Sequence, residues 1–278
     1  MRYKTILVLA DHGRRWPARA EVAVELARRF EAHLVGLHAV TPVFTRAYRT
    51  VEAGPMVIEG QKQLALEQAK RAETMFRQAL EKGALANADW RMSSDDALAA
   101  VALHSRYADL VVMGQPDLQD DSDVEPAFAH RLVLVADRPV LFVPYIGPSG
   151  TLGKRVLLAW NATREAARAA TDALPFLQAA DEVCVVVVNV GGASHGQAPG
   201  ADIGLYLARH GVHAKVEVIE GADIFHDAGN LLLSRAADLS SDLIVMGAYG
   251  HSRFSELVLG GVTRTMFESM TVPVLMSH

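Results

Sequence analysis

The chain has a single cysteine among its 278 residues, and basic clusters are missing from it as well. Cys184 has no second cysteine with which to form an intrachain disulfide, and its apolar setting, EVCVVVVNV, predicts a buried strand residue. No block of lysine and arginine interleaved with aromatic residues occurs, and the formal net charge is -5. Nucleic acid is therefore not an expected partner.

Long apolar runs and metal-ligand motifs are absent too. No stretch reaches the ~20 apolar residues of a membrane-spanning helix. The apolar run in MRYKTILVLADHG is too short for a secretory signal, so we expect a cytoplasmic protein without a membrane partner. The eleven histidines form no His-Glu-x-x-His motif and no Cys/His cluster, so no metal site is predicted.

What the sequence does contain is an internal repeat. Four apolar segments recur in the same order in both halves, and the closest match pairs ADLVVMGQ with SDLIVMGA. The simplest explanation is duplication of one unit of roughly 140 residues. The segment Pro144–Lys154, PYIGPSGTLGK, has the composition of a linker. We therefore predict one domain at 1–146 and a second at 153–278.

Within each half, short runs of Val, Ile and Leu alternate with amphipathic segments. In the second half we predict strands at Arg155–Trp160, Glu182–Val190, Lys215–Ile219, Leu243–Met246 and Val272–Met276. Nearly continuous apolarity suits parallel strands that are covered on both faces. The intervening segments, such as TREAARAATDALPFLQAA, have the spacing of helices. This pattern predicts an α/β fold of two tandem five-stranded, doubly wound, parallel-sheet (Rossmann-like) domains.

A glycine-rich stretch follows the fourth predicted strand of the second half, where ligands bind in such sheets. In MGAYGHSRFSELVLGGVTRTM, Gly247, Gly250 and Gly260 precede a predicted helix. Glycines allow close backbone approach, and the unpaired N–H groups of a helix start suit phosphate. Glycine pairs also occur at ordinary loop-to-helix junctions, and the lysine of a Walker loop is missing. The spacing alone leaves both interpretations open.

The combined pattern is more specific. G-x-x-G, nine residues and a further glycine after strand four resemble the nucleotide-binding motif of the universal stress protein family. AWNATREAARA, VPVLM and the duplicated layout are similar to its tandem members, so that the resemblance covers essentially the whole chain. It implies five-stranded α/β units, ATP or ADP binding in some members, with or without Mg, and pairing of units through their last strands.

The resemblance also implies a set of site residues. The adenine and ribose region maps to Ala159, Trp160, Asn161, Val190 and Met246. The phosphate loop maps to Gly247, Gly250, Gly260, Gly261, Val262 and Thr263, with His251 and Arg253 as further candidates for a terminal phosphate. Two positions depart from the family pattern: Asn161 replaces an aspartate, and Gly261 replaces a serine or threonine.

The first half departs further. Asp11 matches the family aspartate and Gly114 is retained, but the later glycines are missing. Acidic residues stand in their place and would repel phosphate: Asp117, Asp120, Asp121, Asp123 and Glu125. We therefore predict a degenerate first site. A solvated loop is the favoured interpretation of this acidic run, and a cation site is the alternative.

Three functions remain open. We favour a nucleotide-binding stress-response regulator that acts on unidentified protein partners. A slow ATP hydrolase is the second, although no general base was identified and no catalytic residue is assigned. A nucleotide-free interaction scaffold is the third. As exposed edges, Val140–Val143 and Val272–Met276 would be liabilities, so we predict that they pair as an internal pseudo-dimer. Association of two chains into a homodimer is left open.

Overall fold

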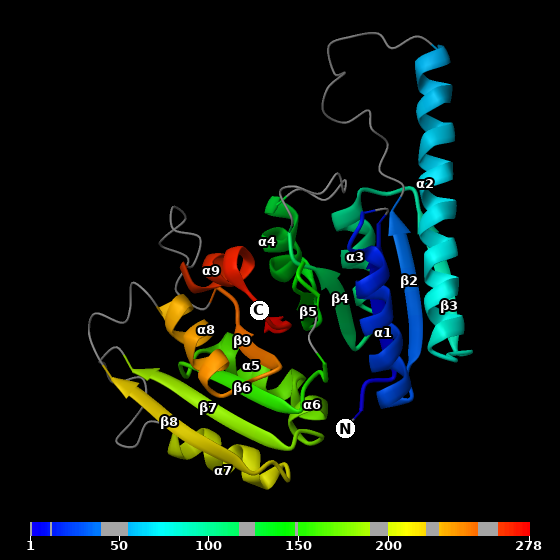
Figure 1. The fold of residues 1–278 in the computed structure, drawn as a ribbon. Helices are drawn as coiled ribbons and strands as arrows, with labels where there is room; N and C mark the ends of the chain where they lie inside the picture. Colours follow the sequence, from blue (N-terminus) through cyan, green and yellow to red (C-terminus); the bar gives the residue numbers. More distant parts are fainter. Residues whose placement is uncertain are drawn as a thin grey trace. The chain divides into compact units, whose positions relative to one another are not determined.

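The computed structural model describes residues 2–11, 13–39, 55–116, 126–147, 150–189, 200–220, 228–249 and 261–278. The chain forms two compact units, an N-terminal unit of Tyr3–Arg138 and a C-terminal unit that comprises Pro139–His278 (Figure 1). Within the described residues, none of the helices combines the length and the apolar character needed to cross a membrane.

The N-terminal unit contains a parallel sheet in the order β3-β2-β1-β4. Its strands are β1 (Thr5–Ala10), β2 (His33–Ala39), β3 (Ala88–Ser93) and β4 (Leu110–Gly114). Its helices are α1 (Trp16–Phe30), α2 (Pro55–Lys82), α3 (Ala97–Ser105) and α4 (Pro126–Val135). Helix α1 packs on α2, and α3 packs on α4. Strand β1 is buried along nearly its whole length, as expected for a sheet that is covered on both faces.

The C-terminal unit has the strand order β5-β10-β9-β6-β7-β8. Its strands are β5 (Val140–Val143), β6 (Arg155–Trp160), β7 (Glu182–Asn189), β8 (Ala214–Glu220), β9 (Leu243–Gly247) and β10 (Val274–Ser277). Its helices are α5 (Arg164–Asp172), α6 (Leu174–Leu177), α7 (Ala201–Arg209), α8 (Ala228–Asp238) and α9 (Gly261–Ser269). Helix α8 packs on α9 (Figure 1). Helices α5 and α7 are linked by a hydrogen bond of 3.0 Å between the hydroxyl groups of Thr171 and Tyr206.

The predicted fold class is confirmed, and so is the pairing of the two last strands. Strand β5 runs antiparallel to β10, with Leu141 opposite Leu275, whereas all other pairs in the unit are parallel. The strand that ends the first repeat therefore belongs to the core of the C-terminal unit. Cys184 is buried in β7 as predicted, and burial raises the pKa of its thiol.

Two prolines set element bounds that the apolar pattern did not predict. The segment TREAARAATDALPFLQAA forms two helices, α5 and α6, because Pro175 has no N–H to continue the α5 ladder. Strand β10 begins at Val274 and not at Val272, since Pro273 cannot donate to the sheet. The carbonyl of Pro273 still accepts a bond from the Ile244 N–H at 3.0 Å.

Candidate functional site

The carboxyl ends of β6 and β9 leave the C-terminal sheet side by side. Val156, Leu157 and Leu158 of β6 pair with Leu243, Ile244 and Val245 of β9 in parallel register. Ala159–Asn161 and Met246–Gly247 therefore reach the same edge of the sheet, where ligands of doubly wound folds bind. Ala159, Trp160 and Asn161 are each partly exposed at this edge.

Asn161 builds the turn between β6 and α5. Its Oδ1 accepts hydrogen bonds from the Thr163 N–H at 3.3 Å and from the Thr163 hydroxyl at 2.8 Å. The Thr163 hydroxyl in turn accepts from the Ala166 N–H at 3.3 Å and caps α5. Because Oδ1 is committed to this turn, the amide NH2 is the group that Asn161 can offer to a ligand.

Gly247 lets α5 approach the end of β9. A Cβ at this position would lie 2.5 Å from the Ala166 backbone nitrogen and 2.9 Å from the Glu165 Cβ, so any larger residue would collide with the helix start. Met246 is 4% exposed and packs in the core. The structure therefore gives both residues a packing role beside the ligand role that the resemblance implies.

Glu165 is a buried carboxylate in the first turn of α5, only 7% exposed. Burial acts to raise its pKa, but bonds from its own backbone N–H and from Arg164 outweigh this, together with the charges of Arg164 and His278. The net effect is a lowered pKa. A negative charge is thus held at the helix N-terminus, where the helix dipole favours it.

Helix α9 begins at the same end of β9 with Gly261, Val262 and Thr263. Gly261 is exposed, Val262 is half-buried, and Thr263 is buried. The first N–H groups of a helix have no intrahelical acceptor, so this start offers donors to an anion. Five predicted site residues lie outside the described residues: Val190, Gly250, His251, Arg253 and Gly260. So does the acidic run of the first half, 117–125.

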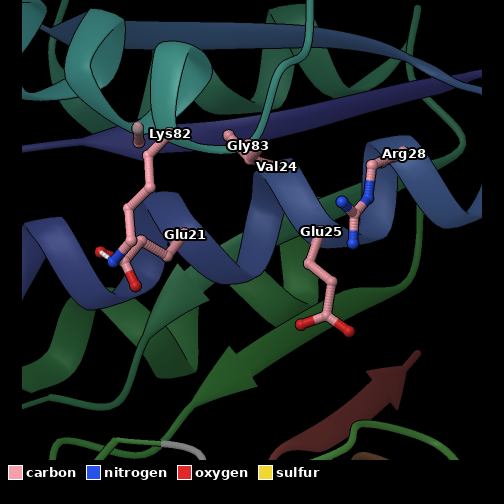
Figure 2. A pocket seen from close by; sticks show the side chains of 7 residues that line it. Glu21, Val24, Glu25, Arg28, Lys82 and Gly83 are labelled. Carbon is pink, nitrogen blue, oxygen red and sulfur yellow. Dashed lines mark hydrogen bonds and ion pairs between the residues drawn. The ribbon is translucent and has the colours of Figure 1, made fainter.

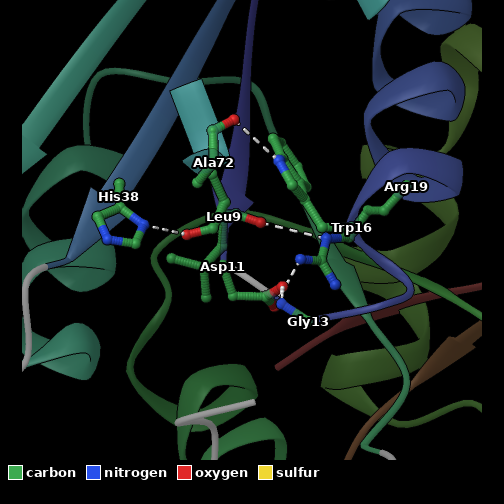
Figure 3. A network of polar contacts seen from close by, with 8 residues as sticks. Leu9, Asp11, Gly13, Trp16, Arg19, His38 and Ala72 are labelled. Atoms are coloured by element: carbon green, nitrogen blue, oxygen red, sulfur yellow. Dashed lines mark hydrogen bonds and ion pairs between the residues drawn. The ribbon is translucent and has the colours of Figure 1, made fainter. Parts of the chain in front are cut away.

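In the N-terminal unit, the corresponding edge is occupied by the side chain of Arg19 (Figure 3). Asp11 Oδ1 accepts from the Gly13 N–H at 3.0 Å, and Oδ2 forms an ion pair with Arg19 at 2.6 Å. Arg19 Nε also donates to the Leu9 carbonyl at 3.1 Å, and its guanidinium lies 5.2 Å from the Trp16 ring. The Arg19 side chain is 6% exposed, so the ion pair is largely buried.

Arg19 also fills the space next to Gly114 at the end of β4. A Cβ on Gly114 would overlap the Arg19 guanidinium. In the second repeat, the residue eight positions after Asn161 is Ala169, whereas Arg19 stands eight positions after Asp11. The two units thus differ at their ligand edges by the exchange of an alanine for an arginine on the buried face of the first helix.

A surface hollow of about 270 Å³ lies between α1 and the end of α2 in the N-terminal unit (Figure 2). Its charged lining is balanced, with Glu21, Glu25, Arg28 and Lys82, and Lys82 pairs with Glu21 at 2.8 Å. The last turns of α1 and α2 lead into the amino ends of β2 and β3, which is the opposite edge from the ligand edge. We assign it no ligand. Among the described residues, no group of three or more His, Cys, Asp or Glu is placed to hold a metal ion.

The sequence interpretation missed Arg19, Glu165 and His278. For Arg19 a signal was present, because aligning the two repeats places an arginine opposite Ala169 on a stripe that is otherwise apolar. The positions of Glu165 and His278 could be found only from the folded structure. Each depends on how close α5 and β10 come to the end of β9.

Comparison with known proteins agrees with this architecture. The universal stress protein family matches twice, at residues 2–144 and 153–278. A universal stress protein from Archaeoglobus fulgidus DSM 4304 is similar over 98% of this chain and 95% of its own, with a TM-score of 0.72 and 14% identity. A functionally unknown protein from Pseudomonas aeruginosa PAO1 covers 99% of this chain and 92% of its own, with a TM-score of 0.59 and 13% identity. The search of curated proteins gave no match.

The two structural similarities establish the fold, and the paired family matches span nearly the whole chain. The chain belongs to the universal stress protein family, as a tandem two-domain member.

Proposed function

We propose that this protein is a cytoplasmic stress-response regulator that binds ATP or ADP at the carboxyl edge of its C-terminal unit. The observation that carries the proposal is the convergence of two strand ends at one edge. The ends of β6 and β9 lie side by side there, as their parallel pairing requires, and α9 is the next helix after β9 along the chain. Under this proposal the anion site is made by the polar turn at Asn161, by Gly247 and by the first N–H groups of α9, which have no intrahelical acceptor.

Under this proposal, the partly exposed residues after β6 hold the base and the ribose. Trp160 supplies an aromatic surface, and Asn161 supplies the amide donors that its turn leaves over. Ala159, Val190 and Met246 complete the apolar side. The phosphates lie against the start of α9, with Gly247, Gly250, Gly260, Gly261, Val262 and Thr263 forming the loop and His251 and Arg253 adding charge. Mg accompanies the nucleotide as its counterion.

We further propose that domain 1–146 is the degenerate copy and that domain 153–278 carries the site. Two features of the first copy support this division. Its acidic run replaces the phosphate-loop glycines, and the Arg19 guanidinium stands at the ends of β1 and β4, where a ligand would need space. One nucleotide per chain is the expected stoichiometry.

Isothermal titration calorimetry of the intact protein with ATP, ADP and AMP tests the proposal. We expect saturable binding with one site per chain, and we expect Gly250→Asp to abolish it by placing a carboxylate in the phosphate loop. Circular dichroism and the thermal midpoint of the variant provide the folding control. No heat and no thermal protection at millimolar nucleotide would overturn the proposal in favour of a nucleotide-free scaffold.

A further inference from the structure

His278 lies beside the first residues of the loop that leaves β9. In the parallel pair of β9 and β10, Ser277 is opposite Gly247, and His278 follows Ser277 directly. The Ala248 N–H donates to the Ser277 carbonyl at 2.9 Å, so the two chain segments remain together past the end of the sheet. The imidazole is thereby placed at the ligand edge, next to Gly247.

Two contacts fix the imidazole, and a third holds the main chain of His278. Nδ1 lies 3.0 Å from the Ala248 carbonyl oxygen, and the ring packs edge-on against Tyr249, with ring centroids 6.3 Å apart. Arg168 of α5 donates to the main-chain oxygen of His278 at 2.9 Å. Tyr249 holds its own position at a left-handed φ of 58°, which is uncommon for a residue other than glycine.

The contact with Ala248 determines which ring nitrogen is available. A carbonyl oxygen can only accept, so Nδ1 carries the proton in that bond. Nε2 has no hydrogen-bond partner among the described residues, and His278 is partly exposed. The ring is therefore anchored through one nitrogen and offers the other to whatever enters the site.

In the part of the chain that the structure describes, the charges near this imidazole come from α5. Glu165 is close enough for the charge of His278 to contribute to its lowered pKa, and it also pairs with Arg164 at 2.9 Å. Arg168 pairs with Asp172 at 3.6 Å, and Asp172 accepts from the Ser277 hydroxyl at 2.8 Å. Tyr249 remains a neutral phenol, since burial raises its pKa. Within the described residues these acids and bases are paired with one another, and none of them hydrogen-bonds Nε2.

We propose that His278 is a phosphate-contacting residue of the C-terminal site, with Nε2–H of the charged ring donating to a phosphate oxygen of the bound nucleotide. This inference rests on the proposed function. A phosphate oxygen accepts and does not donate, so Nε2 must carry a proton when the contact forms, whereas Nδ1 keeps its bond to Ala248 in both charge states.

Two variants separate the contact from the anchor. In His278→Asn, the amide NH2 stands close to the place of Nδ1 and keeps the bond to Ala248, but Nε2 is lost. In His278→Gln, the amide reaches the place of Nε2. We expect His278→Asn to weaken ADP binding about tenfold, as the loss of one charge-assisted hydrogen bond predicts, and to leave adenosine binding unchanged. His278→Gln recovers part of the ADP affinity.

The difference between ADP and adenosine provides a readout that separates a phosphate contact from a purely structural role. Calorimetry with both ligands on the wild type and on His278→Asn should show a loss of affinity for ADP and none for adenosine. His210→Asn is the matched control, because His210 also packs on a tyrosine, Tyr206, but is exposed at the end of α7. It should behave as the wild type.

The failures of the two proposals are distinguishable. If the wild type binds ADP and His278→Asn binds it equally well, the phosphate contact is overturned and nucleotide binding stands. If the wild type binds no nucleotide, both proposals fail together. A loss of adenosine affinity equal to the loss of ADP affinity would assign His278 to general loop support and would also overturn the contact.

Discussion

At the scale of single residues, the Arg19–Asp11 pair is the interaction that we expect to matter most for stability. The guanidinium is 6% exposed and the carboxylate 14% exposed, and they meet at 2.6 Å. Arg19→Ala leaves a buried carboxylate without its counter-charge and frees the Leu9 carbonyl, so we expect a loss of about 3 kcal/mol in the free energy of unfolding. Urea unfolding followed by the fluorescence of Trp16 and Trp90 measures it.

The double variant Asp11→Asn/Arg19→Ala is the control for this prediction. It gives the first repeat the residues of the second, Asn161 and Ala169, and removes the stranded charge. It should therefore be more stable than Arg19→Ala alone by at least about 1 kcal/mol. Equal instability of the two variants would show that Arg19 acts through its packing on Trp16 and not through the ion pair.

Glu165 makes the stability of the C-terminal unit depend on pH. Its pKa in the folded chain is lowered from the ordinary value of 4.5. The ionised form therefore contributes stability that is fully present above that value and is lost as the pH falls through the folded pKa. Glu165→Gln should be less stable than the wild type by about 1 kcal/mol at pH 7, and the difference should shrink below pH 4.5.

Denaturant unfolding of both proteins at pH 7 and pH 3.5 checks this expectation for Glu165. A matched substitution is Glu268→Gln on α9, where the carboxylate is 58% exposed and pairs with Arg264 on the same helix. That exchange should change stability little at either pH. If the difference in stability between the wild type and Glu165→Gln instead grows as the pH falls, the folded protein favours the protonated carboxyl and the pKa of Glu165 is not lowered.

Comparison of the predicted residues with the observed contacts shows how much of the site the sequence can predict. Asn161 and Asp11 were identified by their place after a strand, and both build the same turn in the structure. Arg19 was not identified, since its role depends on reaching back from the fourth residue of α1 to the Leu9 carbonyl. Local motifs determine turns, whereas the filling of the space above a strand end depends on side-chain length and direction.

At the scale of elements, α5 approaches β9 closely because Gly247 has no Cβ. Gly247→Ala places a carbon 2.5 Å from the Ala166 nitrogen, which is helix backbone and cannot rotate away. We expect a loss of about 2 kcal/mol and a displaced α5 start, with weaker nucleotide binding as a consequence. Gly261→Ala is the matched control for stability, because nothing lies within 4 Å of its added carbon and alanine favours the helix.

Thermal unfolding and calorimetry with ADP on both glycine variants measure this difference. Gly261→Ala should be as stable as the wild type or slightly more stable. If Gly247→Ala is equally stable, the contact between α5 and the end of β9 is looser than the structure shows.

The bounds of the strands and helices show where the hydrophobic pattern alone was enough to predict an element. Strand β6 begins and ends as predicted from RVLLAW, because a continuous apolar run between polar turns has one solution in a covered sheet. The single break between α5 and α6 and the late start of β10 were not predicted. Both follow from the missing N–H of a proline, Pro175 and Pro273, which hydrophobic periodicity does not register.

At the scale of the whole molecule, the repeat boundary and the core boundary differ. Duplication predicted two domains, and two compact units are present, but β5 of the first repeat packs in the C-terminal unit. The repeat boundary reflects the duplication, whereas the core boundary reflects hydrogen bonding and burial. Comparing the two halves of the sequence identifies the repeat boundary. The apolar character of the two last strands was the signal that they pair in one core.

Phe142 of β5 should therefore determine the stability of the C-terminal unit, although it lies in the first repeat. It is fully buried and packs edge-on against Phe267 of α9, with ring centroids 4.7 Å apart. Phe142→Ala removes this contact and leaves a cavity under α9, so we expect a loss of about 3 to 4 kcal/mol. Hydrogen exchange by mass spectrometry should show lost protection in α9, β9 and β10, with β1–β4 unchanged.

Phe76→Ala provides the opposite case, because Phe76 is buried in the N-terminal unit between Trp16 and Trp90. It should expose β1–β4 to exchange and leave α9 protected. The two patterns together test the division of the chain at Arg138, since each cavity can only loosen the core that surrounds it. Lost protection in β1–β4 after Phe142→Ala would assign β5 to the N-terminal core. If Phe142→Ala also weakens ADP binding while β1–β4 stay protected, β5 of the first repeat supports α9, and the start of α9 forms the proposed phosphate site.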